Sequence, residues 1–528
     1  MHSTCYNKFV RITANTFINA APETVLKQAF GYEEFRHTQK EIITNVLEHK
    51  DTLAVMPTGG GKSLCYQIPA LIFEGITIVI SPLISLMQDQ VDSLEKKGIS
   101  SVFINSTLEW EEFLETSYRI RNGDVKIVYI SPEGLSSNKI KELLSNSFVK
   151  VSCVCIDEAH CVSEWGHDFR PDYLEIFQIR HLCPDAVMLA LTATATEAVR
   201  KDIVRNLGMR NPKIFISSFN RPNIYLSVKP KISALDLVCD CIERHKNESG
   251  IIYCLSRRQV DELTLSLKHL KYSVKPYHAG LSDDIRAKNQ TDFIQGKVNI
   301  IVATVAFGMG IDKSDVRFVI NYDLPKSIEE YYQEIGRAGR DGKPSEALLL
   351  FSRGDAHKIR YFFEELADKT KAENLLNAMV NYGSMHMCRR KALLGYFGEV
   401  YEPEKHPEQS KCCDICSRGK TKMYDVTVPV QKFLCCMIRT NERFGTAYVI
   451  DILMGSRQKR IVENGHNKIS TFGIGKDITK EKWFELTEMM IMAGYVKKEG
   501  EYNILKLTSA ARQILATREE ILLPIKLS

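Results

Sequence analysis

A glycine-rich stretch is the first part of the sequence whose residue types indicate chemistry, and it runs Thr58-Gly59-Gly60-Gly61-Lys62-Ser63. Consecutive glycines let backbone N–H groups converge on one anion, and a helix that begins after them adds its positive end. Lys62 is then placed to reach the β- and γ-phosphates of a nucleotide, and the Ser63 hydroxyl to bind Mg²⁺. Met56 stands where the full phosphate-loop pattern has its first glycine. We predict a nucleoside triphosphate site here; an ordinary strand-to-helix turn is the alternative.

Two acidic residues, Asp157 and Glu158, follow the apolar run 151–156. A carboxylate after a buried strand can hold Mg²⁺ through water, and the second acid can orient or deprotonate the attacking water. Such pairs are common by chance, but here the glycine loop precedes the pair and Thr192-Ala193-Thr194 follows it. We therefore predict hydrolysis of the bound nucleotide.

Strands and helices must bring these residues together. The runs 76–80, 126–130, 151–156 and 187–191 are apolar, end in polar residues and are separated by helix-like segments. This pattern is typical of a parallel sheet covered on both faces, which binds ligands at its carboxyl edge. The pattern recurs at 250–255 and 299–304. A second α/β lobe is therefore predicted.

Upstream of the glycine loop, Gln39 carries an amide that can pair both ways with an adenine edge, and Tyr32 can stack on the ring. An amphipathic helix with an aromatic residue is the alternative explanation for this segment.

Composition narrows the class of protein. The 528 residues are 44% hydrophobic, and no apolar run approaches the roughly 18 residues of a membrane span. The first residues lack a signal-peptide pattern. Fifteen cysteines, many inside apolar runs, favour reduced thiols in an intracellular compartment. The net charge is only +5, but residues 425–528 carry 16 Lys/Arg against 12 Asp/Glu, which favours a polyanionic partner for that region.

The segment after the acidic pair carries a family resemblance, and it runs Cys161-Val-Ser-Glu-Trp165-Gly-His167-Asp168-Phe169-Arg170-Pro171-Asp-Tyr173. It resembles the aromatic-rich loop of RecQ-type helicases within superfamily two, which couples single-strand contact to ATP hydrolysis. Trp165 and Phe169 offer faces for base stacking, and Arg170 offers a phosphate contact. A Trp buried under a loop is the alternative. The resemblance covers roughly residues 22 to 518.

The second lobe carries two candidate segments. The turn Ala306-Phe-Gly308-Met-Gly310-Ile311-Asp312 is expected to approach a DNA backbone or the ATP ribose. In the segment 333–342, Arg337 and Arg340 are three residues apart, which places them on one side of a helix turn. Guanidinium groups match phosphate geometry and stabilise the charge on a transferring phosphoryl group. The resemblance implies that Arg340 is the finger-type residue and Arg337 its companion.

The resemblance to RecQ-type helicases implies roles for further residues. We expect Arg36, Thr58, Asp312 and Gln333 to contribute to nucleotide binding, and His278 and Thr304 to contact DNA.

Four cysteines indicate a metal site: Cys388, Cys412, Cys413 and Cys416. Four thiolates suit a closed, structural Zn²⁺ site. The adjacent pair departs from a plain Cys-x-x-Cys run, although some RecQ relatives show the same arrangement; unliganded cysteines are the alternative.

Beyond about residue 425, short amphipathic helices are predicted at 428–439, 446–452 and 480–493, followed by a hairpin that turns at Gly500. This order suggests a winged helix, similar to the RecQ C-terminal domain. Tyr502 near the tip is placed to stack on a terminal base pair, or else packs on its own hairpin. Lys468, Lys476, Lys497 and Lys498 are candidate phosphate contacts.

The expected fold class is α/β, with two RecA-like parallel-sheet lobes, a small zinc-binding helical platform and a winged helix. We place an N-terminal extension at 1–21, the lobes at 22–212 and 213–350, the zinc-binding subdomain at 351–424, the winged helix at 425–518 and a tail at 519–528. By the resemblance, we expect no HRDC-type terminal bundle, which many relatives carry, among these 528 residues.

The resemblance implies an ATP-dependent DNA helicase that moves 3′-to-5′ on single-stranded DNA, with ATP, Mg²⁺ and Zn²⁺ as cofactors and roles in recombination, repair and replication. We expect tailed duplex DNA as substrate, a single-strand-binding protein as a partner, a monomeric state and no membrane. The expected location is the bacterial cytoplasm or nucleoid, or the nucleus in a eukaryote. An RNA helicase, and a DNA-binding protein that uses ATP only as a switch, are the alternatives.

Overall fold

The computed structural model describes residues 16–527 apart from 37, 83, 105–107, 165–169, 309–312, 364–367, 386, 403–410, 418–422, 500–503, 518 and 524. The chain divides into two compact units, which are described separately: residues 1–380 with 390–412, and residues 381–389 with 413–528. Trp165, Phe169, Asp312 and Tyr502, four of the predicted site residues, lie outside the described residues.

The first unit contains a seven-stranded sheet in the order β3-β4-β2-β5-β6-β1-β7, and every neighbouring pair is parallel. Four of its strands, β1, β2, β4 and β6, are buried at every residue, which is the pattern of a sheet covered on both faces. The strands are β1 Thr52–Val55, β2 Ile76–Ile80, β3 Ser101–Ile104, β4 Ile127–Ile130, β5 Val151–Ile156, β6 Val187–Thr192 and β7 Lys213–Ile216.

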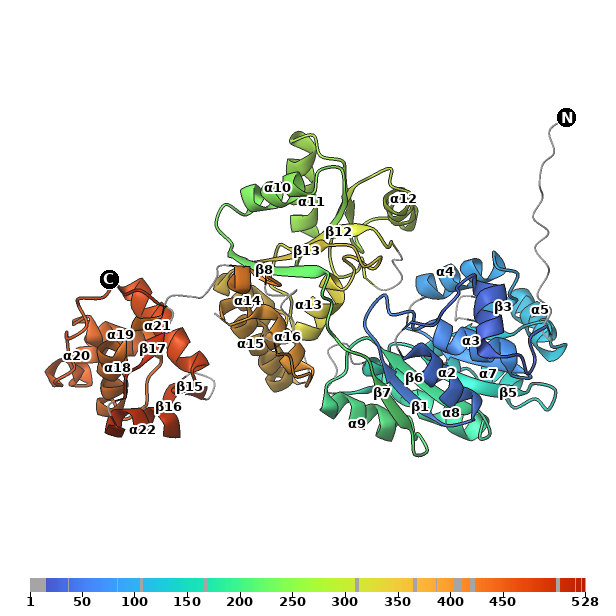
Figure 1. The fold of residues 1–528 in the computed structure, drawn as a ribbon, viewed down its shortest axis with the longest axis horizontal. Coiled ribbons are helices and arrows are strands. Elements are labelled where there is room, and N and C mark those ends of the chain that lie inside the picture. Colours follow the sequence, from blue (N-terminus) through green and yellow to red (C-terminus); the bar gives the residue numbers. More distant parts are fainter. Residues whose placement is uncertain are drawn as a thin grey trace. The chain divides into compact units, whose positions relative to one another are not determined.

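Helical segments alternate with these strands (Figure 1). They are α1 Pro22–Val25, η1 Leu26–Phe30, α2 Gln39–Leu47, α3 Leu64–Ile72, α4 Ile84–Glu95, α5 Trp110–Arg121, α6 Pro132–Leu135, α7 Asn138–Leu144, η2 Ala159–Val162, η3 Pro171–Ile176, α8 Phe177–Leu182 and α9 Glu197–Asn206. One strand differs from our expectation, because β7 pairs with β1 and the first sheet therefore extends beyond residue 212.

A six-stranded parallel sheet follows in the order β10-β11-β9-β12-β13-β8. Its strands are β8 Ile224–Pro230, β9 Ser249–Tyr253, β10 Val274–Tyr277, β11 Ile300–Ala303, β12 Val316–Asn321 and β13 Ser345–Phe351. Its helices are α10 Ala234–Arg244, α11 Arg257–His269, α12 Asp283–Ile294 and α13 Ile328–Ile335. The buried core of this lobe includes Val260, Val302 and Phe318.

Beyond the second sheet the described chain is mainly helical. Its elements are α14 Arg353–Tyr361, α15 Lys369–Ser384, α16 Arg389–Tyr396, α17 Asp414–Ser417, α18 Thr427–Arg439, α19 Thr446–Leu453, α20 Lys459–Glu463, η6 His466–Lys468, α21 Lys480–Met492 and α22 Ser509–Thr517, with the short strands β14 Tyr424–Asp425, β15 Val496–Glu499, β16 Ile504–Leu507 and β17 Leu522–Leu523.

The second unit has its own apolar core. Trp483 is completely buried there, its Nε1 donates to the Gly475 carbonyl at 2.9 Å, and its ring lies 6.1 Å from that of Phe433. The strands β15 and β16 pair antiparallel, as the predicted hairpin requires. Figure 1 shows α18, α19 and α21 gathered beside this hairpin, the arrangement expected of a winged helix.

Candidate functional site

The glycine-rich loop joins β1 to α3 at the carboxyl edge of the first sheet. Gly59 and Gly61 have φ angles of 81° and 78°, a left-handed conformation that favours glycine. A Cβ at Gly60 would lie 2.9 Å from the Pro57 carbonyl. The backbone of the loop therefore depends on glycine at these positions.

The Gln39 side chain is buried against this loop. Its Nε2 donates to the carbonyls of Gly60 at 3.3 Å and Gly61 at 3.0 Å, and its Oε1 accepts from the Arg36 N–H at 2.8 Å. Both ends of the amide thus contact protein backbone, and the side chains of Tyr32 and Arg36 are exposed beside it.

Lys62 and Ser63 complete the loop, and both are half-buried. Ser63 precedes α3 but makes no side-chain capping bond to the helix, so its hydroxyl is not used as a helix cap. The Lys62 ammonium is close enough to Asp157 to lower the pKa of that carboxyl, against larger opposing effects.

The acidic pair follows β5. Burial first, and the neighbouring Glu158 second, raise the pKa of Asp157 to about 6. Glu158 has a φ of 48°, and its N–H donates to Asp157 Oδ1 at 3.0 Å. Two carboxyl groups crowded into a buried position favour a cation between or beside them. The donor set of Ser63 and Asp157 therefore fits Mg²⁺.

A chain of contacts leads from the acidic pair to the second lobe. The His160 ring Nδ1 lies 3.3 Å from Glu158 Oε2 and 2.9 Å from Thr192 Oγ1. Thr192 Oγ1 in turn donates to the Thr194 carbonyl at 3.1 Å, and Gln333 Nε2 donates to Thr194 Oγ1 at 3.4 Å. The predicted site residues of both lobes are therefore linked by a chain of close polar contacts.

The two arginines follow the end of α13. We expected them on one side of a helix turn, but α13 ends at Ile335 and both lie in the turns beyond it, so this prediction is wrong. Gly339, with a φ of 56°, interrupts the helical path between them. A Cβ placed at Gly59 would lie 3.1 Å from Arg340 Cγ, so Arg340 does pack on the glycine loop. Arg337 is buried.

Sequence reasoning missed Arg221, which lies between β7 and β8. Its Nη1 donates to the carbonyls of Thr58 at 3.1 Å and Gly336 at 3.0 Å, and its Nη2 donates to those of Ala338 at 2.8 Å and Gly339 at 3.0 Å. One guanidinium thus joins the glycine loop to the arginine-bearing turns. Nothing in the spacing around Arg221 predicts this role.

Three predicted DNA contacts lie within the described residues. Arg170 Nη1 donates to the Pro82 carbonyl at 3.1 Å. His278 is 4% exposed; its Nε2 lies 3.1 Å from Asp261 Oδ1, and its Nδ1 accepts from the Gly280 N–H at 3.2 Å. Thr304 is half-buried after β11. The His278 ring therefore contacts both α11 and the loop that follows β10.

The four predicted metal-binding cysteines come together. The sulfur atoms of Cys388, Cys412, Cys413 and Cys416 lie within 4.8 Å of one another. The Cys416 N–H donates to Cys413 Sγ at 3.4 Å, a bond that favours a thiolate. Four sulfur donors at this separation suit tetrahedral Zn²⁺ with no open position.

Four family models match the chain: DEAD/DEAH box helicase at residues 36–202, helicase conserved C-terminal domain at 233–342, RecQ zinc-binding at 353–417 and RQC domain at 420–528. The chain is 44% identical to the ATP-dependent DNA helicase RecQ of Haemophilus influenzae, over 94% of this chain and 80% of that protein. It is 41% identical to that of Bacillus subtilis, over 93% and 83%. The chain belongs to the RecQ family of ATP-dependent DNA helicases.

The RecQ zinc-binding match contains all four clustered cysteines, so this cluster is the zinc site of the RecQ fold. The predicted family, the fold class and the enzyme class are therefore confirmed.

Solved structures share the RecQ helicase core at low identity. Saccharomyces cerevisiae Dbp5 bound to RNA and ADP BeF3 matches with a TM-score of 0.53 and 18% identity, over 75% of this chain and 97% of that one. Mycobacterium smegmatis Lhr bound to ssDNA and AMP-PNP matches with a TM-score of 0.53 and 16% identity, over 92% and 60%. These likenesses concern the fold. Within the described part of the chain, no helix has the length and apolar character needed to cross a membrane.

Proposed function

We propose that this chain uses ATP hydrolysis to move 3′-to-5′ along single-stranded DNA and to unwind the duplex ahead of it, in recombination, repair and replication. The observation that carries the proposal is the meeting of the glycine loop, the acidic pair and the arginine-bearing turns at one place, in a chain of the RecQ family.

Each group has a chemical role in this proposal. The N–H groups of residues 59–61 and the Lys62 ammonium bind the β- and γ-phosphates. Ser63 and Asp157 hold Mg²⁺, which neutralises charge on the phosphates when bound. Glu158 orients and deprotonates the attacking water. Arg340 and Arg337 stabilise the charge that spreads over the transferring phosphoryl group.

Movement along DNA follows from the division of the ATP site between the two lobes. Arg221 and Gln333 contact the first lobe at Thr58 and Thr194, next to the phosphates in this proposal. Because γ-phosphate release changes what these side chains contact, each hydrolysis cycle opens and closes the cleft between the lobes. Two lobes that grip one strand alternately then step along it.

The remaining parts bind DNA. We assign Trp165, Phe169 and Arg170 to single-strand contact, Asp312 to the nucleotide, and the hairpin tip with Tyr502 to separation of the strands. We also propose a monomer that acts on tailed duplexes coated by a single-strand-binding protein, inside the bacterial cytoplasm.

The test compares ATP hydrolysis and strand separation on duplexes with a 3′ tail, a 5′ tail or no tail, and on matching RNA duplexes. We expect unwinding of the 3′-tailed DNA alone. Lys62→Ala should abolish hydrolysis and unwinding, whereas Lys50→Ala, at an exposed lysine before β1, should leave both unchanged.

Other outcomes would separate the alternatives. Unwinding of RNA with equal efficiency would make the chain an RNA helicase. DNA-stimulated hydrolysis without strand separation on any tail would make it a translocase. Basal hydrolysis that survives Glu158→Ala unchanged would contradict the role of Glu158 as base and favour an ATP-operated switch.

A further inference from the structure

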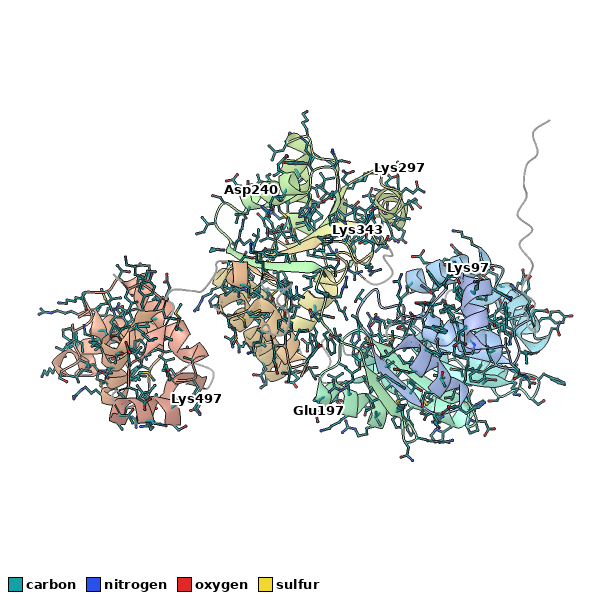
Figure 2. All side chains as sticks on the ribbon, viewed as in Figure 1. Lys97, Glu197, Asp240, Lys297, Lys343 and Lys497 are labelled. Carbon is teal, nitrogen blue, oxygen red and sulfur yellow. The ribbon has the colours of Figure 1, made fainter. Side chains whose placement is uncertain are left out.

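The second lobe contains another group of metal-ligating side chains, made of residues outside the four-cysteine cluster. Cys241 lies in the last turn of α10, His245 directly follows this helix, and Glu346 lies on β13. One ligand atom from each of the three lies within 4.8 Å of the other two. Asp240, labelled in Figure 2, is the residue before Cys241 and marks the position on α10.

The separations suit one metal ion. His245 Nε2 lies 3.4 Å from Glu346 Oε2, and Cys241 Sγ lies 3.9 Å from the same oxygen. Tetrahedral Zn²⁺, with bonds of about 2.0 Å to nitrogen and oxygen and about 2.3 Å to sulfur, separates its ligand atoms by roughly 3.3 to 3.6 Å. The first distance already agrees, and the second requires a shift of a few tenths of an ångström.

Neighbouring groups hold the ligand atoms in these orientations. His245 Nδ1 lies 2.8 Å from Glu248 Oε2, and the ring stacks on Phe318 at 5.5 Å between centroids. A carboxylate on the far nitrogen is the usual support of a zinc-binding histidine. Glu346 Oε1 accepts from Arg244 Nη2 at 2.8 Å and from Ser227 Oγ at 3.4 Å. Glu346 Oε2 thereby lies near both Cys241 Sγ and His245 Nε2.

The net charge of this group of side chains and its exposure to solvent also suit a metal ion. With Cys241 as thiolate and His245 neutral, the two carboxylates and Arg244 leave a net charge of about −2, which one divalent cation neutralises. Arg244 also donates to Glu346 Oε2 from Nη2 at 2.9 Å and from Nε at 3.3 Å, and the ion would displace both bonds. The side chains of His245 and Glu346 are 17% and 13% exposed, which leaves a route for the ion from solvent.

We propose that Cys241, His245 and Glu346 bind a second Zn²⁺ ion, with water in the fourth position, and that this ion ties the end of α10 to β13. Sulfur, imidazole and carboxylate donors together favour zinc over magnesium or calcium.

The test measures the number of zinc ions bound per 528-residue chain. The protein is first equilibrated in a zinc buffer of fixed free concentration and then passed through gel filtration. We expect two ions per chain in the unaltered protein and one in Cys241→Ser. Cys239→Ser, at a half-buried cysteine two residues earlier on α10, should retain two. Cobalt(II) substitution should give thiolate charge-transfer absorption from both sites, and Cys241→Ser should lose only the part from the second site, whereas Cys239→Ser should keep the full absorption.

His245→Gln is a second variant that preserves side-chain size, and it should also bind one ion while its circular dichroism matches that of the unaltered protein. A single ion in the unaltered protein would show that the three residues form an ion-pair network only. Two ions in both Cys241→Ser and His245→Gln would place the additional ion elsewhere. Either result overturns the proposal, and neither bears on ATP hydrolysis.

Discussion

Gln39 illustrates how one side chain serves two partners. We predict that it recognises adenine, yet its amide is bonded to the carbonyls of Gly60 and Gly61 and to the Arg36 N–H. A base edge would have to take over some of these bonds when the nucleotide binds. The amide that we predict to bind adenine therefore also holds the backbone of the glycine loop.

Gln39→Ala should raise the KM for ATP about 10- to 100-fold, because a lost buried hydrogen-bonding pair costs about 1–3 kcal/mol. The KM for GTP should rise less, since guanine presents a different edge. Steady-state hydrolysis with both nucleotides measures the ratio. Gln67→Ala, at a buried glutamine bonded to Gln90, is the control. Equal increases for ATP and GTP would mean that Gln39 only braces the loop.

The buried acidic pair Asp157 and Glu158 shows how burial can favour the binding of a cation. Burial raises the pKa of Asp157 to about 6, so without a cation its charge is poorly tolerated. A divalent ion stabilises the charged form, and the pair is thereby suited to bind one.

The element that positions the arginines is the turn after α13. Gly339 has a φ of 56°, and a Cβ there would meet Ser345 Oγ at 2.7 Å and the Lys343 carbonyl at 2.9 Å. Gly342 also has a positive φ, of 80°, but a Cβ there would meet no atom within 4 Å. Alanine at Gly339 would therefore add both backbone strain and steric overlap, whereas alanine at Gly342 would add backbone strain alone.

Gly339→Ala should lower the free energy of unfolding by about 2–4 kcal/mol, from left-handed strain and overpacking together. Gly342→Ala should cost only about 1 kcal/mol. Urea denaturation measures both. Gly339→Ala should also lower kcat, because Arg340 follows it directly. Equal losses of stability in the two variants would contradict the contacts assigned to Gly339.

Lys126 precedes β4 and is buried, and its Nζ donates to the Phe73 carbonyl at 2.6 Å. Burial lowers the pKa of Lys126 from 10.5 to about 8. The unfolded chain therefore binds more protons than the folded chain between these values, and stability contributed by this group rises as the pH increases from about 8 to 10.5.

The unfolding free energy of the unaltered protein, minus that of Lys126→Met, should accordingly rise between pH 8 and pH 10.5. Chemical denaturation at several pH values measures it. Lys96→Met, at an exposed lysine, is the control. A constant difference for Lys126→Met would mean that the ammonium keeps its ordinary pKa.

At the scale of the whole molecule, catalysis depends on contacts between residues far apart in the chain. Arg221 reaches Thr58, and Gln333 reaches Thr194, so the second lobe contacts both the glycine loop and the segment after β6. In the proposed mechanism, these bonds connect the ATP site to movement of the lobes.

The four-cysteine zinc site also joins residues that lie apart in the chain, because it brings Cys388 to Cys412, Cys413 and Cys416. Cys416→Ser should release one zinc ion per chain and lower the Tm by more than about 4 °C, because a closed structural site contributes to folding. Metal analysis and calorimetry measure both changes. Cys435→Ser, at a half-buried cysteine outside the cluster, should alter neither. Retention of the ion in Cys416→Ser would contradict the four-cysteine coordination.

The parallel-sheet lobes, the family, the zinc-binding cysteines and the hairpin of the winged helix could all be predicted from the sequence. Each depends on local patterns: apolar runs that form buried strands, close spacing of cysteines, and alternation around a turn. The roles of the individual catalytic and DNA-binding residues stay predictions.

Contacts between residues far apart in the chain could not be predicted in this way. The pairing of β7 with β1, the bonds of Arg221, and the approach of Cys241 to Glu346 each join residues separated by about a hundred positions or more. The turn between Arg337 and Arg340 depends likewise on the packing around Gly339. Spacing in the chain cannot specify such contacts, because they depend on which surfaces of the two sheets and their helices pack together.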